Sequence, residues 1–91
     1  MAFKGRDLAE WTGGYWHGDS PLMIEGLFFD TRMIEPKSLF VALSYGVRDG
    51  HDFIEEAMKR GASCCIVERA IALEIPQLIV ENSLEALANI A

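Results

Sequence analysis

The sequence lacks the segments that would take a protein into or across a membrane. No apolar run approaches the length of a membrane span, and no apolar segment follows the early charges of Lys4 and Arg6. We therefore expect neither a membrane span nor a signal peptide. Only two cysteines are present, Cys64 and Cys65, and their adjacent positions exclude a disulfide framework. This usage predicts a protein of the reducing cytoplasm, with both cysteines as small core residues on opposite faces of a strand.

Positive charge is also scarce. The sequence has 8 Lys and Arg residues against 14 Asp and Glu residues, a formal net charge of -6. A nucleic-acid-binding surface needs clustered basic residues, so this composition argues against one, although local cations and backbone amides could still hold one anionic ligand. The phosphate-binding pattern G-x-x-x-x-G-K-[ST], the EF-hand pattern and any Ser/His/Asp or Cys/His arrangement are absent. We therefore expect no catalytic group and no metal site in this sequence.

The sequence does contain a central stretch, residues 39–57, with the pattern of a strand, a loop and a helix in succession. Its continuous apolar run, 39–43, predicts a strand that is covered on both faces and lies inside the sheet. A loop with two glycines follows, and a helix is expected to start at His51 and to end at Gly61. The apolar stripe of that helix consists of Phe53, Ile54, Ala57 and Met58. In open α/β sheets, the loop after such a strand is where ligands bind.

The rest of the chain alternates between strand-like and helix-like patterns. We expect strands at 22–29, 63–68 and 77–80, helices at 5–12 and from 83 onward, a helical turn at 70–73, and connections at 15–21 and 33–38. Asn82 or Ser83 can cap the last helix, whose apolar side consists of Leu84, Leu87, Ala88 and Ala91. That helix has no terminating residue, which indicates an excised domain or a fragment. The alternation predicts a single α/β domain with a small mixed or mostly parallel sheet flanked by helices.

The first candidate binding cluster is Asp30-Thr31-Arg32, which follows the strand expected at 22–29. In an extended chain, Asp30 and Arg32 point to one side and Thr31 to the other. One interpretation is a surface ion pair of little energetic value, and the other is a hydroxyl and a guanidinium placed at a binding edge. Taken alone, this cluster favours the surface ion pair. The acidic residues of the central helix need no functional explanation, because they form i,i+4 pairs, Glu55 with Lys59 and Glu56 with Arg60.

The second candidate cluster is the loop 45–51. Its glycines allow a ligand to approach the backbone closely, and Arg48 could pair with a phosphate group. The start of the following helix offers unpaired N–H groups to an anion. The alternative is an ordinary connection between strand and helix, in which Asp49 or Asp52 caps the helix.

Several motifs, in this order, resemble one family. They are D-T-R at 30–32, Pro36, L-F-V-A-L at 39–43, D-G-H-D-F-I at 49–54, Ala57 and G-A at 61–62. This pattern covers nearly the whole chain and is similar to the amino-terminal domain of the Mur ligases, which build the peptide of peptidoglycan. The closing segment 76–91 most resembles the MurF branch, which joins D-alanyl-D-alanine to UDP-N-acetylmuramoyl-tripeptide. The MurE branch, which adds the third amino acid, is the alternative.

The resemblance implies that residues 1–91 form one domain, which binds the UDP part of a UDP-N-acetylmuramoyl peptide and has no cofactor of its own. It implies two further domains, absent from this sequence, one for ATP and one for the incoming D-alanyl-D-alanine. The whole enzyme would use ATP and Mg²⁺ to convert a carboxylate into an acyl phosphate, which an amine then attacks. By the family pattern, the residues that touch uracil, ribose and diphosphate are Phe29, Thr31, Gly46, Val47 and Arg48. The other hypothesis is a free-standing nucleotide- or protein-interaction module.

Overall fold

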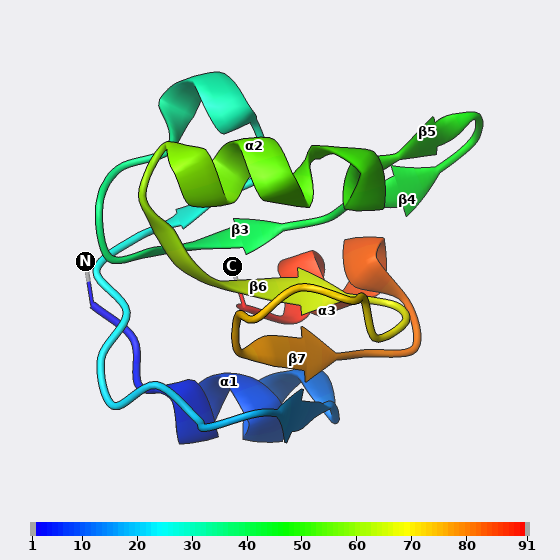
Figure 1. Ribbon diagram of the computed structural model, residues 1–91. Helices are drawn as coiled ribbons and strands as arrows, with labels where there is room; N and C mark the ends of the chain where they lie inside the picture. The colour runs from blue at the N-terminus through cyan, green and yellow to red at the C-terminus, as the bar shows by residue number, and fades with distance from the viewer. Residues whose placement is uncertain (1, 91) are drawn as a thin grey trace.

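The computed structural model describes residues 2–90, with the side chains of Tyr45 and Arg48 left out of the description. It contains a five-stranded sheet in the order β1-β7-β6-β3-β2 and a separate two-stranded hairpin, β4-β5. The elements are α1 (Gly5–Thr12), β1 (Tyr15–His17), β2 (Leu27–Phe28), η1 (Thr31–Met33), β3 (Ser38–Val41), β4 (Ser44–Tyr45), β5 (Arg48–Asp49), η2 (Gly50–Phe53), α2 (Ile54–Lys59), β6 (Ala62–Val67), β7 (Gln77–Ile79) and α3 (Ser83–Ile90), where η marks a 3-10 helix. Figure 1 shows β3, β6 and β7 side by side. This mixed sheet with flanking helices confirms the predicted fold class.

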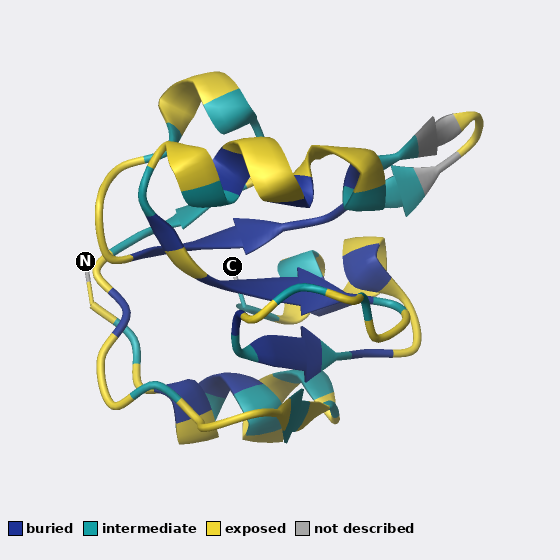
Figure 2. Cartoon of the chain, in the orientation of Figure 1, coloured by how far each residue is buried: buried dark blue, intermediate teal, exposed yellow. Residues whose placement is uncertain are grey.

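Strand β3 is the interior strand that the apolar run predicts. It lies between β2 and β6 and runs parallel to both. Leu39 and Val41 belong to a hydrophobic cluster that includes residues of α1 and α3, whereas Phe40 belongs to a second cluster with residues of α2. The sheet is therefore covered on both faces, and all four β3 residues are buried. Figure 2 shows buried residues concentrated on β3, β6 and β7.

Helix α1 has the predicted bounds, and Gly13 explains where it ends. Gly13 adopts φ 73 and ψ 10, the left-handed conformation that commonly follows a helix, and its N–H donates to the carbonyl oxygen of Ala9.

Among residues 2–90, every helix is too short or too polar to cross a membrane.

The polar connection expected at 15–21 is partly wrong, because Tyr15–His17 forms the edge strand β1, antiparallel to β7. The Trp16 indole Nε1 donates to the carbonyl oxygen of Gly5 at 2.8 Å and so ties this strand to α1. The strand expected at 22–29 is shorter than predicted. Only Leu27–Phe28 pairs with β3, while Ile24 forms an isolated bridge to Phe3 near the start of the chain.

The helical turn expected at 70–73 is not formed, because a buried side chain holds this segment in another shape. The Gln77 Oε1 accepts from the N–H of Ile71 at 2.9 Å, and its Nε2 donates to the carbonyl oxygens of Ile71 and Leu73. This amide satisfies three backbone groups and removes the need for helical hydrogen bonds there.

Two predicted helix faces are also partly wrong. Phe53 is 41% exposed rather than part of the stripe with Ile54, because α2 is preceded by the 3-10 helix η2, which has a different period.

In α3 the buried residues are Ser83 and Ala86, and Leu84 is 50% exposed. Ala91 lies outside the described residues. The N-cap is Asn82, whose Oδ1 accepts from the N–H of Glu85 at 2.9 Å. Ser83 turns inward because its N–H and hydroxyl both donate to the Glu68 carboxylate.

Cys64 and Cys65 are free, fully buried and divided between the two hydrophobic clusters, as predicted. Burial raises the pKa of each thiol to about 12.

We expect neither Cys64 nor Cys65 to react with an alkylating reagent at pH 8 in the folded protein, because the reactive thiolate is not formed. Mass spectrometry should find both modified only in urea, whereas the exposed control Ala72→Cys should react without it. Rapid modification of either native cysteine would contradict this.

Candidate functional site

The loops at the carboxyl ends of the parallel strands form the edge where a ligand is expected. Four adjacent strands of the sheet run parallel to one another: β2, β3, β6 and β7. The segments that follow them are η1, the β4-β5 hairpin, Glu68 with Arg69, and the start of α3. We call this side of the sheet the carboxyl edge.

Asp30, Thr31 and Arg32 do not lie in an extended chain as expected; they begin the 3-10 helix η1. Asp30 caps it, because its Oδ1 accepts from the N–H of Arg32 at 3.0 Å. Asp30 Oδ2 and Arg32 Nη2 form an ion pair at 2.7 Å, and this pairing raises the pKa of Arg32. The Arg32 side chain is 82% exposed, so the pair adds little stability. The surface-ion-pair interpretation therefore fits Asp30 and Arg32, and Thr31 keeps its candidate role.

A hollow of about 260 Å³ lies beside this segment. Its lining is mainly apolar and consists of Leu27, Phe28, Phe29, Asp30 and Met33. Phe29 is 51% exposed and Met33 61% exposed, so both present apolar surface to solvent. An exposed aromatic ring at the end of a strand can stack against a flat base, and the Thr31 hydroxyl nearby in sequence can donate or accept a hydrogen bond.

The loop after β3 is more ordered than its sequence predicts, since it forms the β4-β5 hairpin. Ser44 pairs with Asp49 and Tyr45 with Arg48. Gly46 and Val47 make the two-residue turn, and Gly46 has φ 57, which a glycine at this position adopts without strain. Val47 is fully exposed. The side chain of Arg48, the candidate phosphate ligand, lies outside the described part of the structure, so its role stays a prediction.

The candidate residues fall into two separate groups. Phe29 and Thr31 lie at the end of β2, and Gly46, Val47 and Arg48 lie in the hairpin. In Figure 1 the segment 31–33 lies over one end of α2, whereas the hairpin projects beyond the other end. A ligand that contacts both groups must therefore be elongated, as a nucleoside diphosphate joined to a sugar is.

Sequence reasoning missed a network of polar side chains at the carboxyl edge. We call it the edge cluster; it consists of Ser44, Asp49, His51, Glu68, Arg69 and Ser83. Asp49 caps η2, as the capping alternative predicts, and also forms an ion pair with Arg69 at 2.9 Å. Hydrogen bonds from Arg69 and from the backbone and ring of His51 hold the pKa of Asp49 well below its usual range. The available signal was the D-G-H spacing, because an aspartate two residues before a histidine can cap a helix and bind the ring.

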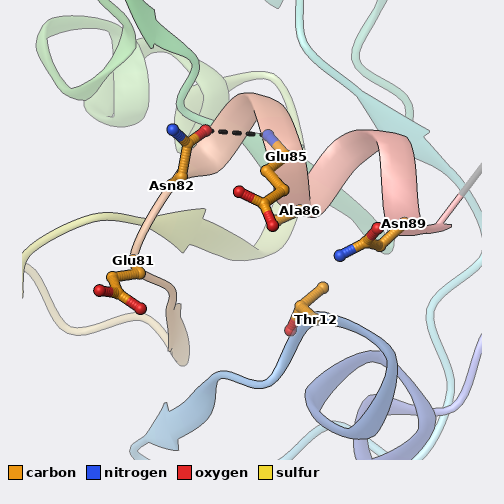
Figure 3. Close-up of a pocket in the computed structure, with 6 residues that line it drawn as sticks. All are labelled: Thr12, Glu81, Asn82, Glu85, Ala86 and Asn89. Carbon is orange, nitrogen blue, oxygen red and sulfur yellow. Dashed lines mark hydrogen bonds between the residues drawn. The ribbon is translucent and has the colours of Figure 1, made fainter.

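A second hollow, of about 400 Å³, lies between α1 and α3 and is polar. Figure 3 shows the six residues that line it, Thr12, Glu81, Asn82, Glu85, Ala86 and Asn89. Its two carboxylates would repel a phosphate group, so this hollow does not suit the anionic ligand expected here. Among the described residues, no group of His, Cys, Asp and Glu side chains is arranged to hold a metal ion.

Known proteins and one family model match most of this chain. Residues 23–91 match the model described as "Mur ligase family, catalytic domain". The chain is 39% identical over 80 residues to the UDP-N-acetylmuramoyl-L-alanyl-D-glutamate–2,6-diaminopimelate ligase of Geobacillus kaustophilus, with 86% of this chain and 16% of that protein covered. It is 36% identical over 70 residues to the UDP-N-acetylmuramoyl-tripeptide–D-alanyl-D-alanine ligase of Escherichia coli, with 77% and 16% covered.

The crystal structure of MurF from Acinetobacter baumannii has the same fold. It superposes with a TM-score of 0.91 at 33% sequence identity and covers 98% of this chain and 20% of that one. The chain thus spans about a sixth to a fifth of the length of these relatives. These matches confirm the family resemblance and the fold that the sequence motifs predict.

Proposed function

Because this chain belongs to the Mur ligase family, we propose that it binds the UDP part of a UDP-N-acetylmuramoyl peptide for a ligase of peptidoglycan synthesis. The observation that carries this proposal is the apolar hollow beside Phe29, at the carboxyl end of β2. Uracil is flat and could stack on Phe29, and the Thr31 hydroxyl could pair with its polar edge. The diphosphate would then extend toward the hairpin, where Arg48 supplies a cation suited to phosphate.

The chemistry of the whole enzyme would lie outside this chain. The sequence contains no G-x-x-x-x-G-K-[ST] pattern, so we propose that ATP and Mg²⁺ act in another domain and that this stretch alone is not catalytic. We also propose that the parent ligase forms an amide bond through an acyl phosphate in the cytoplasm.

The acceptor amino acid is the point on which two candidates compete. We favour the ligase that adds D-alanyl-D-alanine, because the MurF structure from Acinetobacter baumannii matches 98% of the chain. The ligase that adds the third residue of the peptide is the second candidate, because the relative from Geobacillus kaustophilus, named as a diaminopimelate ligase, is 39% identical. ATP hydrolysis by the complete protein would separate the two candidates. D-alanyl-D-alanine should stimulate it in the first case, and diaminopimelate or another third residue in the second.

Chemical-shift mapping with UDP and with uridine tests the proposed site. The two candidate groups are separated, so the two ligands should give different maps. We expect uridine to shift the amide signals around Phe29 and Thr31 only, and UDP to shift those of Gly46 and Val47 as well. Raising the salt concentration should weaken UDP binding, because an exposed arginine–phosphate contact is screened within roughly 10 Å at about 0.1 M ionic strength.

Matched variants assign the contacts. Thr31→Val should weaken both ligands, whereas Arg48→Ala should weaken only UDP. The control is Arg6→Ala, because Arg6 is exposed on α1, which packs on the face of the sheet opposite α2. UDP shifts confined to the amino ends of the strands, or equal binding by all three variants, would contradict the proposed site.

A further inference from the structure

His51 has a buried side chain, and both of its ring nitrogens have partners. Its side chain is only 3% exposed. Nδ1 lies 2.7 Å from Oδ1 of Asp49, and Nε2 lies 2.9 Å from the backbone nitrogen of Glu68. A backbone N–H can only donate, so Nε2 is the acceptor and carries no proton. The neutral ring with its proton on Nδ1 satisfies both contacts, because that proton can be donated to the Asp49 carboxylate.

The contacts of His51 form part of a closed ring of hydrogen bonds. The hairpin begins at Ser44, whose N–H donates to the Ser83 hydroxyl at 2.9 Å and whose own hydroxyl donates to Asp49. The Ser83 hydroxyl and N–H donate to the Glu68 carboxylate at 2.8 and 2.7 Å. The Glu68 N–H donates to His51, and His51 donates to Asp49, where the hairpin ends. The ring thus joins both ends of the hairpin to Glu68, which follows β6, and to Ser83 at the start of α3.

The hairpin needs such an anchor. Each of its strands has two residues, and an isolated two-stranded hairpin is at best marginally stable in water. Its turn residues, Gly46 and Val47, are exposed. The orientation of the turn therefore depends on the contacts at the base of the hairpin, and the contacts of His51, whose side chain is 3% exposed, are among them.

We propose that His51 is a positioning residue that holds the β4-β5 hairpin against the carboxyl edge through the neutral ring protonated at Nδ1. The proposal rests on the proposed function in one respect: the orientation of the hairpin affects binding only if its turn contacts the substrate. The effect on the hairpin itself does not depend on any ligand.

Amide hydrogen exchange of a His51→Gln variant tests the effect on the hairpin. We expect the Ser44 and Gly50 amides to exchange about tenfold faster than in the parent protein, as for a local opening that has lost an ordinary hydrogen bond. The Ala42 amide, which donates to the carbonyl oxygen of Ile66 inside the sheet, should be unaffected. The control is His17→Gln, because His17 is exposed in the edge strand β1. Unchanged exchange at Ser44 and Gly50, or equal acceleration at Ala42, would overturn the proposal.

The nitrogen chemical shifts of the two histidine rings provide a measurement that needs no variant. The His51 ring should show a protonated Nδ1 and a bare Nε2, while His17 should show the averaged values of a solvated ring. A His51 ring protonated at Nε2, or averaged like His17, would overturn the proposal even if His51→Gln does not fold.

UDP titration of the same variant separates this inference from the proposed function. If the hairpin binds the diphosphate, His51→Gln should weaken UDP several-fold and leave uridine unchanged. If UDP does not bind the parent protein, the proposed function fails, while the exchange and tautomer results still decide the role of His51.

Discussion

Replacement of Val41 with aspartate is expected to unfold the domain. Val41 is fully buried in the interior strand β3, opposite Ile66 of β6 and within an apolar cluster. A carboxylate there would lose its water without gaining a partner, at a cost of several kcal/mol. A domain of this size has a total stability of roughly 5 to 14 kcal/mol. Circular dichroism should therefore show loss of the cooperative thermal transition of the parent protein.

The matched control is Val47→Asp. It makes the same chemical change in the turn of the hairpin, where the valine side chain is fully exposed. Its melting temperature should stay close to that of the parent protein. A Val41→Asp protein that melts cooperatively near the same temperature would show that β3 tolerates a charge and is not enclosed.

Gly50→Ala should give the second largest loss of stability. A Cβ at Gly50 would lie 2.5 Å from the backbone nitrogen of Leu43 and 2.7 Å from the carbonyl carbon of Ala42. The backbone must therefore move, and the hydrogen bond from the Gly50 N–H to the carbonyl oxygen of Leu43, 2.7 Å long, is then weakened. Overpacking and the weakened bond together should cost about 2 to 4 kcal/mol. Thermal melting should fall by roughly 10 °C or more.

Gly13→Ala separates this steric effect from the general effect of replacing a glycine. Gly13 has φ 73, but a Cβ there would meet no atom within 4 Å. It should cost only about 1 kcal/mol, the penalty of a left-handed alanine. Equal losses for the two variants would mean that the chain accommodates a methyl group at residue 50, and that the start of η2 is not tightly packed against Ala42 and Leu43.

The sequence predicted the elements whose signals are local and strong. The continuous apolar run 39–43 identifies β3, Ser38–Val41, because a strand that is covered on both faces buries residues on both of its sides. Helix α1 is bounded correctly because Gly13 supplies the left-handed conformation that ends it. These features depend on a few neighbouring residues and need no knowledge of the rest of the chain.

The elements it missed depend on partners far away in the sequence. Tyr15–His17 has no apolar alternation of its own and becomes a strand because β7 supplies its hydrogen bonds. The buried face of α3 is displaced because Ser83 binds Glu68, which no periodicity encodes. Gln77 is a different case, because it reshapes the nearby segment 71–73 through a side-chain amide that no periodicity encodes.

The candidate site shows the same division. Phe29 and Thr31 were identified through the motif at 30–32, and the structure places Phe29 at an apolar hollow. The hairpin that presents Gly46 and Val47 was not predicted, because its Ser44 and Asp49 have partners far away in the sequence, Ser83 and Arg69. His51, the centre of the edge cluster, was predicted as the start of a helix and the last residue of the candidate loop 45–51, without a role for its side chain.

The place of β1 in the sheet has a consequence for how the chain folds during synthesis. Tyr15 pairs with Ile79, and α1 packs against α3, so the elements of residues 5–17 find their partners among residues 77–90. Closing so long a loop carries an entropic cost, and contacts of this kind form late. On the ribosome, the parallel core of β2, β3 and β6 can assemble first. The amino-terminal segment must then wait, with Trp16 and Leu8 uncovered, until β7 and α3 have left the exit tunnel.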